Sequence, residues 1–299
     1  SFRHTALGAS LKTNKTGIIM KLLSYGLDLR MEPRLAFSLR GYAVDVMRAS
    51  LWMKEDRNAQ DFLKLASSME LTLKEWGHLY PLLKRLEAAF QNIDITGLTI
   101  YNRSLGMPEA DIVFFAPVPN PPSLRYFNVF NPEKPATFIF GNTQTLLGHR
   151  QTQPFSGLLT QAEIAAILGH VDSGLDVAGY SIVNNWFDPQ QPGNDGLSWG
   201  LATSMGPYFV PAEELELRKL GKGFGLDLQI SVNEKSIAEG HFKEMKLSFA
   251  EMLMEAQKTN LQAADVICSG SPLKPDSSLP LKAGDSINVE IQALGVLSN

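Results

Sequence analysis

Two neighbouring segments within residues 159–187 constrain the fold of this chain more than any other feature. Each segment alternates small apolar residues with polar residues, which is the pattern of a β-strand. The pattern predicts strands at 161–169 and 178–184. Gln161 and Glu163 begin the first strand, and two asparagines end the second. We therefore expect a cluster of polar side chains where these strands lie side by side.

Strand patterns recur through the second half of the chain. The further predicted strands are 136–141, 207–211, 225–232, 265–269 and 285–296. A helix is predicted at 247–258, because Phe249, Met252 and Leu253 fall on one helical face. Residues 112–299 are therefore expected to form one β-rich domain.

The first part of the chain, residues 20–111, mixes strand and helix patterns. Short strands are predicted first, including a hairpin, and residues 57–92 have helical periodicity. Thr72 and Glu75 have the spacing of a capping box at the start of a second helix. Pro81 is expected to kink or interrupt that helix.

A proline-rich segment separates the two parts. Residues 93–111 are predicted to be a connector, and the following strand runs into four prolines between 117 and 122. Prolines preset the backbone and lack an amide donor, so a domain boundary is expected near residue 112. The predicted fold class is α+β and mostly β, with a small N-terminal α+β domain at 20–111 and a larger β-rich domain at 112–299.

The first 19 residues contain basic residues but no acidic ones. Such a segment is expected to be a leader or extension, and it is excluded from the fold prediction. A basic, Ser- and Thr-rich segment is typical of an organelle-targeting peptide. An extended start site or a cloning remnant is the alternative.

Composition excludes several classes of protein. The net charge of -4 gives no reason to expect nucleic-acid or membrane binding, and no apolar run approaches the roughly 20 residues of a membrane-spanning helix. Cys268 is the only cysteine, which excludes internal disulfides and a cysteine-based zinc site. An intracellular and most simply cytoplasmic location is expected.

Three segments of the second half carry a pattern that is shared with a known family. They are Met-Gly-Pro-Tyr-Phe-Val-Pro from Met205, Ala-Asp-Val-Ile-Cys-Ser-Gly-Ser-Pro from Ala264, and Leu-Lys-Ala-Gly-Asp from Leu281. With the strand that begins at Gln161, their order and spacing resemble the fumarylacetoacetate hydrolase family over roughly residues 116–299. The resemblance implies a domain of mixed β-sheets in a β-barrel-like roll, and a homodimer.

The resemblance also identifies the positions of a metal site. In the family, two Glu and one Asp bind a divalent metal such as Mg²⁺ or Mn²⁺. Glu163 matches the second Glu, whereas Gln161 and Asn185 stand at the first Glu and at the Asp. Because attraction to a dication grows with ligand charge, we expect a degenerate site and no metal cofactor. If Mg²⁺ or Mn²⁺ is bound, Glu163 is its ligand and the two amides are weak neutral ligands.

Other positions of the implied site are also changed. Phe140 and Leu197 stand where the family has lysines, and no loop with a His and a Glu follows the first strand of the domain. Trp186 and Trp199 are expected to line a more apolar pocket or to pack in the core.

His149 and Ser271 are the remaining candidates for catalysis. His149 follows a turn near the implied entrance and is a candidate proton shuttle, although a lone His is more often a hydrogen-bonded structural residue. Ser271 stands where the family has a Thr, and the resemblance implies that its hydroxyl binds a substrate carboxylate; the alternative is a turn residue after Gly270. Cys268, on an apolar strand, is expected to pack rather than react.

Two functions follow from these residues, and the sequence leaves open whether the protein is an enzyme. In the first, the chain is a metal-free relative without hydrolase activity, which has a binding or assembly role or a different, metal-independent reaction. In the second, it is a metal-dependent C–C hydrolase, decarboxylase or tautomerase that acts on a 2-oxo or 1,3-dicarbonyl acid. The expected ligand is a small 2-oxo acid or a more apolar molecule.

Overall fold

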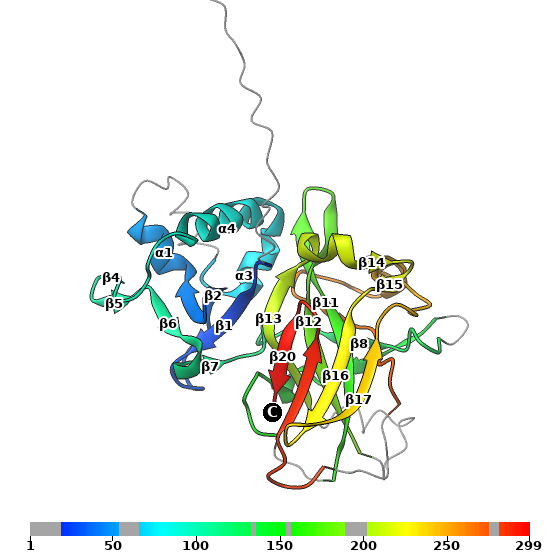
Figure 1. Cartoon of the computed structure of the whole chain (residues 1–299). Coiled ribbons are helices and arrows are strands. Elements are labelled where there is room, and N and C mark those ends of the chain that lie inside the picture. Colours follow the sequence, from blue (N-terminus) through cyan, green and yellow to red (C-terminus); the bar gives the residue numbers. More distant parts are fainter. Residues whose placement is uncertain (1–18, 54–65, 133–135, 154–156, 189–201, 275–280) are drawn as a thin grey trace, which may run out of the picture.

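The computed structural model has two lobes, which Figure 1 shows side by side. Its described residues are 19–53, 66–132, 136–153, 157–188, 202–274 and 281–299. The smaller lobe carries most of the helices, and the larger lobe consists mainly of strands. The predicted class, α+β and mostly β, is confirmed.

A long hairpin forms the centre of the larger lobe. Strand β11 (Leu159–Val171) runs antiparallel to β12 (Gly174–Phe187), and Gln161 lies directly opposite Asn185. Gly174 has a φ of 120° at the turn, a backbone conformation that favours glycine. Small residues such as Ala and Gly let both faces of this hairpin pack against other elements, so most of its side chains are buried.

The hairpin belongs to a twelve-stranded sheet that runs through both lobes. Ten strands follow the order β6-β3-β2-β1-β13-β12-β11-β18-β8-β9, while β7 pairs with β1 and β10 pairs with β13. In the smaller lobe these strands are β1 (Leu22–Gly26), β2 (Arg34–Leu39), β3 (Tyr42–Asp45), β6 (Gly106–Pro108) and β7 (Val113–Phe114). In the larger lobe they include β8 (Leu124–Phe127), β9 (Phe138–Gly141), β10 (Leu146–Leu147), β13 (Thr203–Pro211) and β18 (Val266–Cys268). The β8–β18 and β10–β13 pairs are parallel, so the sheet is mixed.

A second sheet of four strands packs over the long hairpin. Its order is β17 (Lys235–His241), β16 (Asp227–Val232), β19 (Ile287–Ile291) and β20 (Gly295–Ser298). The predicted strand at 285–296 is wrong in one respect, because a turn divides this region into β19 and β20. Ile164, Ile182, Val289 and Leu297 belong to the apolar core that the two sheets share.

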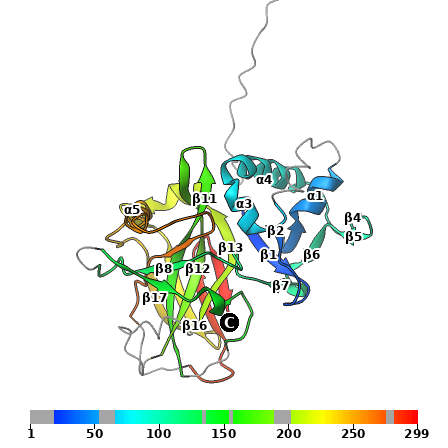
Figure 2. The same ribbon diagram turned by 180° about the vertical axis from the view of Figure 1, so that it is seen from behind.

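Helices and short elements complete the fold. The predicted C-terminal helix is α5 (Phe249–Ala256), which begins with a capping box of Ser248 and Glu251 and is seen at the outer side of the larger lobe in Figure 2. The remaining helical elements are α1 (Val46–Trp52), α3 (Met69–Lys74), α4 (Trp76–Phe90), η1 (Glu109–Asp111), η2 (Thr143–Thr145) and η4 (Ala212–Arg218). Two further strand pairs are β4 (Thr99–Ile100) with β5 (Arg103–Ser104), and β14 (Lys219–Leu220) with β15 (Gly223–Phe224).

Two predictions about the helices are wrong. The Ser68 side chain, rather than Thr72, caps α3, and the Thr72 hydroxyl donates to the Ser68 carbonyl oxygen (2.7 Å) inside that helix. Pro81 does not interrupt α4, which is continuous from Trp76 to Phe90. Pro81 lies on the exposed face, so burial of the leucines on the opposite face offsets the loss of one backbone hydrogen bond.

The boundary between the lobes is packed like a core. The Trp76 ring of α4 meets the Phe209 ring of β13 edge-on at 5.1 Å, and β1 pairs with β13 through Leu22 and Phe209. Residues of both lobes belong to one buried apolar cluster. The predicted connector at 93–111 also joins this framework, since β6 extends the main sheet.

The mixed β-sheets that the resemblance implies are present in the larger lobe, and their topology is open. Across the described ranges, the strands form an open twelve-stranded sheet with a four-stranded sheet beside it, and no closed ring of strands. Among the same residues, no helix has both the length and the apolar character that crossing a bilayer requires.

Candidate functional site

The polar residues of the long hairpin lie on one face of the main sheet. Gln161 is opposite Asn185, Asn185 is opposite Thr203 on β13, and Glu163 is opposite Val183 on β12. Side chains that face each other across paired strands share a face, so the register brings Gln161, Glu163, Asn185 and Thr203 together. Gln161 is partly exposed, whereas the other three are buried in the interior.

Glu163 is the acid at the centre of this group. Its Oε2 accepts a hydrogen bond from the Gly270 backbone N–H (2.8 Å), while its buried Oε1 has no hydrogen-bond partner among the described residues. Burial raises the pKa of Glu163 to about 8, although the Gly270 hydrogen bond acts in the opposite direction. The side chain is therefore mainly protonated at neutral pH, and the protonated form is a hydrogen-bond donor.

A tyrosine and a threonine lie beside this acid. The Tyr126 hydroxyl is 2.5 Å from the Thr203 Oγ1, and Cys268 lies between β8 and β11 in the pairing order. Burial raises the pKa of the Tyr126 hydroxyl and of the Cys268 thiol, and the nearby Glu163 raises both further. Sequence reasoning missed Tyr126 and Thr203, because their strands meet the hairpin only through long-range pairing. Cys268 is buried in the core, as predicted.

The two asparagines of β12 have different surroundings. The Asn185 Oδ1 is buried and has no hydrogen-bond partner among the described residues. Asn184 points to the other face, where its Oδ1 accepts from the Thr160 hydroxyl (2.5 Å) and from the Gln161 backbone N–H (3.2 Å). Asn184 therefore holds the hairpin together, whereas Asn185 belongs with Glu163.

Two predicted pocket residues lie on the opposite face of the sheet. The Trp186 indole N–H donates to the Ser204 Oγ (2.9 Å) there. Phe140 is paired with Arg125, so it faces away from Tyr126 and lies with 54% of its surface exposed. On the Glu163 face the corresponding position is Gly141, where a Cβ would collide with the Tyr126 ring. Leu197 and Trp199 lie outside the described residues.

The side chains of both catalytic candidates, His149 and Ser271, accept hydrogen bonds from backbone N–H groups. The His149 Nδ1 accepts from the Ser298 backbone N–H (3.0 Å), and burial, followed by the charge of Arg150, lowers the pKa of His149 to about 4. The ring is thus neutral at pH 7 and does not titrate near it. The Ser271 Oγ accepts from the Leu273 backbone N–H (3.2 Å), which is the contact of a turn serine.

The donor atoms around Glu163 do not fit a tightly held divalent metal. They comprise one carboxylate and two neutral amides, and one oxygen of the carboxylate already faces the Gly270 N–H. Within the described ranges, no group of three or more His, Cys, Asp or Glu side chains is arranged to hold a metal ion. Mg²⁺ binds strongly only where several carboxylates or phosphates supply charge, so this donor set is a poor match.

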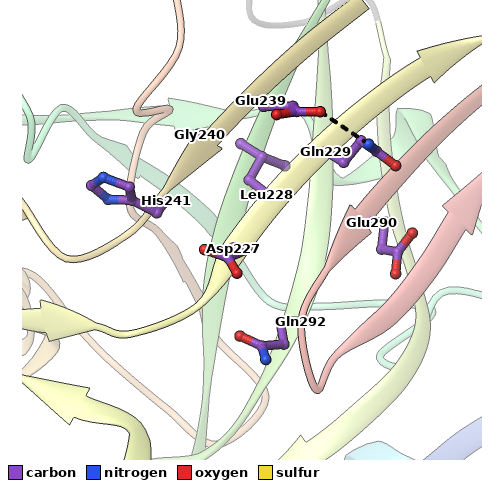
Figure 3. Close-up of a pocket in the computed structure, with 8 residues that line it drawn as sticks. All are labelled: Asp227, Leu228, Gln229, Glu239, Gly240, His241, Glu290 and Gln292. Atoms are coloured by element: carbon purple, nitrogen blue, oxygen red, sulfur yellow. Dashed lines mark hydrogen bonds between the residues drawn. The ribbon is translucent and has the colours of Figure 1, made fainter. Parts of the chain in front are cut away.

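A separate hollow of about 590 Å³ lies on the outer face of the four-stranded sheet (Figure 3). Gln229 stands between Glu239 and Glu290 on neighbouring strands, and its Nε2 donates to the Glu239 Oε1 (3.3 Å). Asp227 and His241 line the same hollow. These side chains project from a different sheet than Glu163, so the hollow is not part of the Glu163 site.

Solved structures with the same fold include enzymes of one family. The maleylpyruvate hydrolase from Sphingobium sp. SYK-6 matches with a TM-score of 0.67 and 17% identity, over 93% of this chain and 97% of that one. The fumarylacetoacetate hydrolase from Exiguobacterium antarcticum gives a TM-score of 0.62 and 17% identity, over 94% and 98%. The 2-hydroxyhepta-2,4-diene-1,7-dioate isomerase from Mycobacterium marinum gives 0.59 and 16%, over 94% and 97%.

At these identities the likeness establishes the fold alone. A comparison with curated proteins finds no match. The family model for the fumarylacetoacetate (FAA) hydrolase C-terminal domain matches residues 125–299, which is more than half of the chain. The resemblance that the motifs carry is thereby confirmed, and the chain belongs to the fumarylacetoacetate hydrolase family.

Proposed function

We propose that this family member binds no divalent metal at the Glu163 site and lacks metal-dependent hydrolase activity. Its role is then to bind a small 2-oxo acid or a more apolar ligand, to act as an assembly component, or to catalyse a metal-independent reaction. The observation that carries the proposal is the donor set, in which a single carboxylate stands among amides and a backbone N–H.

The physical argument concerns charge. Three carboxylates in one cavity repel each other unless a cation lies between them, whereas one carboxyl group in the same cavity is neutral when it holds a proton. Glu163 lies diagonally across the hairpin from Asn185, at a separation that long side chains span. A protonated Glu163 offers the Asn185 Oδ1 a donor, which supports a site that is complete without metal.

The same two oxygens favour a second candidate function. The Glu163 Oε1 and the Asn185 Oδ1 are buried acceptors with no donor in the described part of the chain, and a cation would satisfy both. One fold neighbour, the maleylpyruvate hydrolase from Sphingobium sp. SYK-6, has been solved with manganese(II) and pyruvate. Under this hypothesis the chain binds Mg²⁺ or Mn²⁺ weakly and acts on a 2-oxo or 1,3-dicarbonyl acid.

Restoring the missing charges separates the two candidates. We expect elemental analysis of the purified protein to find no stoichiometric metal, and calorimetric titration to show at least about tenfold tighter Mn²⁺ binding by the Gln161→Glu/Asn185→Asp variant. Without metal, this variant should unfold about 2 kcal/mol more easily, because the added carboxylates repel Glu163. Mn²⁺ should then restore its stability by mass action.

The matched control carries the same two changes together with Glu163→Gln. It keeps the fold and both new carboxylates but removes the original one, so its affinity for Mn²⁺ should fall between the wild type and the double variant. About one metal ion per chain in the wild-type protein would overturn the metal-free proposal. That result would leave the metal-dependent reaction as the function of the site.

A further inference from the structure

Two charged side chains of the main sheet, Arg125 and Glu163, lie on opposite faces. Arg125 precedes Tyr126 on β8, and successive side chains of a strand alternate between the faces of a sheet. The Arg125 guanidinium forms an ion pair with Asp265 (3.2 Å) and donates to the Asn260 carbonyl oxygen (2.7 Å). The positive charge of Arg125 is therefore paired on its own face, away from the Glu163 site.

The nearest neighbours of Glu163 along and across the strands of its own face are apolar. Val183 is opposite Glu163 on β12, Met205 is opposite Val183 on β13, and Ala165 follows on the same face of β11. All three are buried and belong to one apolar cluster. Moving an ion of either sign from water into such surroundings costs free energy unless a counter-charge is present.

The pKa values of the ionisable groups on this face agree with these surroundings. Burial raises the pKa of Glu163, and the opposing influence is the Gly270 N–H rather than a cation. Burial also raises the pKa of the Tyr126 hydroxyl and of the Cys268 thiol, and no Lys, Arg or His of the described residues opposes this effect. Within the described structure, an anionic ligand at this site would therefore meet no positive side chain.

The site presents two hydrogen-bond acceptors that a ligand can satisfy. The Glu163 Oε1 and the Asn185 Oδ1 are buried, and neither has a hydrogen-bond partner among the described residues. Asn185 is opposite Thr203, whose Oγ1 lies 2.5 Å from the Tyr126 hydroxyl, and either oxygen of this pair can be the donor. Because buried acceptors are normally paired, a ligand that supplies N–H or O–H donors is complementary to these oxygens.

Gln161 identifies the side of the site that is nearest to solvent. It is the partly exposed member of the group, whereas Glu163, Asn185 and Thr203 are buried on the same face. A ligand that approaches from solvent therefore meets an uncharged amide first. A charge introduced at position 161 would lie at this boundary, so it avoids most of the cost of burying an ion.

We propose that the Glu163 site binds an uncharged carbonyl compound that carries N–H or O–H donors, such as the primary amide of a 2-oxo acid, and rejects the corresponding carboxylate. The two N–H groups of a primary amide match the two acceptors, Glu163 Oε1 and Asn185 Oδ1, and the Thr203 hydroxyl is the donor to a carbonyl oxygen of the ligand. Asn185 and Thr203 are then the residues that determine specificity. The inference rests on the metal-free proposal, because a bound dication would supply the counter-charge that a carboxylate needs.

The first test compares three probes that differ in one chemical group. Pyruvate is an anion, pyruvamide is neutral with two N–H donors, and methyl pyruvate is neutral without a donor. Each is titrated into the wild-type protein at pH 7 with EDTA present, and binding is followed by saturation-transfer NMR. Pyruvamide should bind at least about tenfold more tightly than methyl pyruvate, which leaves the two acceptors unpaired, and pyruvate should bind most weakly.

The second test changes the charge of the site. The Gln161→Lys/Glu163→Gln variant places a cation at the partly exposed position and removes the buried acid, so it should prefer pyruvate to pyruvamide by at least about tenfold. The matched control, Glu163→Gln alone, has no cation and should still prefer pyruvamide. The wild-type series decides the question by itself if the double variant does not fold.

The outcomes separate this inference from the proposal on which it rests. If the metal-free wild type binds pyruvate more tightly than pyruvamide, or does not bind pyruvamide, the inference is overturned while the metal-free proposal stands. If the purified protein carries about one metal ion per chain and EDTA abolishes its binding of pyruvate, the metal-free proposal is overturned, and this inference with it.

Discussion

Two buried acids in the larger lobe, Asp265 and Glu163, differ in how many hydrogen-bond and ion-pair partners surround them. Asp265, just before β18, accepts from the Ser123 hydroxyl (2.6 Å) and the Gln262 N–H (2.8 Å), and it forms a buried ion pair with Arg125 (3.2 Å). Glu163, on the adjacent strand β11, has one backbone donor and no cation among the described residues.

This difference distinguishes an acid that only stabilises the fold from an acid that belongs to a binding or catalytic site. A carboxylate that only stabilises the fold is surrounded by donors, because an unpaired buried charge costs several kcal/mol. A buried acid with a free oxygen instead needs a proton, a metal or a ligand from outside. Glu163 has the second pattern, and its raised pKa is the electrostatic consequence.

Replacing Arg125, the cation that pairs with Asp265, should have the largest effect on stability. We expect Arg125→Met to lower the free energy of unfolding by about 3–5 kcal/mol at pH 7 in urea titrations, because the buried Asp265 loses its ion-pair partner. The control, Arg30→Met, removes an exposed pair with Asp28 and should cost less than about 1 kcal/mol. Equal losses in both variants would show that burial does not distinguish these pairs.

The second effect concerns the proton on Glu163. As pH rises above the ordinary value of 4.5, the unfolded chain loses this proton while the folded protein keeps it until about pH 8. The folded state therefore loses stability across this window, by about 1.4 kcal/mol per pH unit at most, and the contribution is constant above it. Glu163→Gln should become progressively more stable relative to the wild type between pH 5 and 8. If the free energies of unfolding of the wild type and of Glu163→Gln changed with pH in parallel, Glu163 would not be buried in its protonated form.

The smallest predicted effect concerns His149, a partly buried base whose Nδ1 accepts a backbone hydrogen bond. The pKa of His149 is lowered from 6.5 to about 4. Below pH 6.5 the His149 ring takes up a proton in the unfolded chain but stays neutral in the folded protein. The free energy of unfolding is therefore highest above pH 6.5 and decreases as the pH falls towards 4. Because the ring is partly exposed, we expect a loss of about 1 kcal/mol between pH 7 and 5. His149→Gln should remove this loss, and a wild-type curve that stays flat in this range would contradict the assignment.

The sequence predicted features that depend on local periodicity or on motif order. Alternation identified β11 and β12, and motif order placed Gln161, Glu163 and Asn185 on strands that the structure pairs. The family assignment followed from the same motifs and is confirmed.

Features that depend on register or tertiary packing were not predicted. Tyr126 joins Glu163 only through the parallel pairing of β8 with β18, for which the sequence has no signal. Phe140 was expected at a family lysine position in the pocket, but its pairing with Arg125 puts it on the opposite face, and Gly141 is on the Glu163 face. A shift of one residue along a strand reverses the side chain, and the sequence does not fix that register. Pro81 remains inside a helix because tertiary packing overrides local propensity.

The protection of β6, β17 and β20 limits the size of any assembly that forms through the sheets. A molecule with two open edges at opposite ends of a sheet adds copies without limit and grows into a fibre. Here β6 ends at Pro108, β17 carries Lys235 and Glu239, and the Arg150 N–H occupies the Ser298 carbonyl oxygen of β20, so these three edges resist such growth.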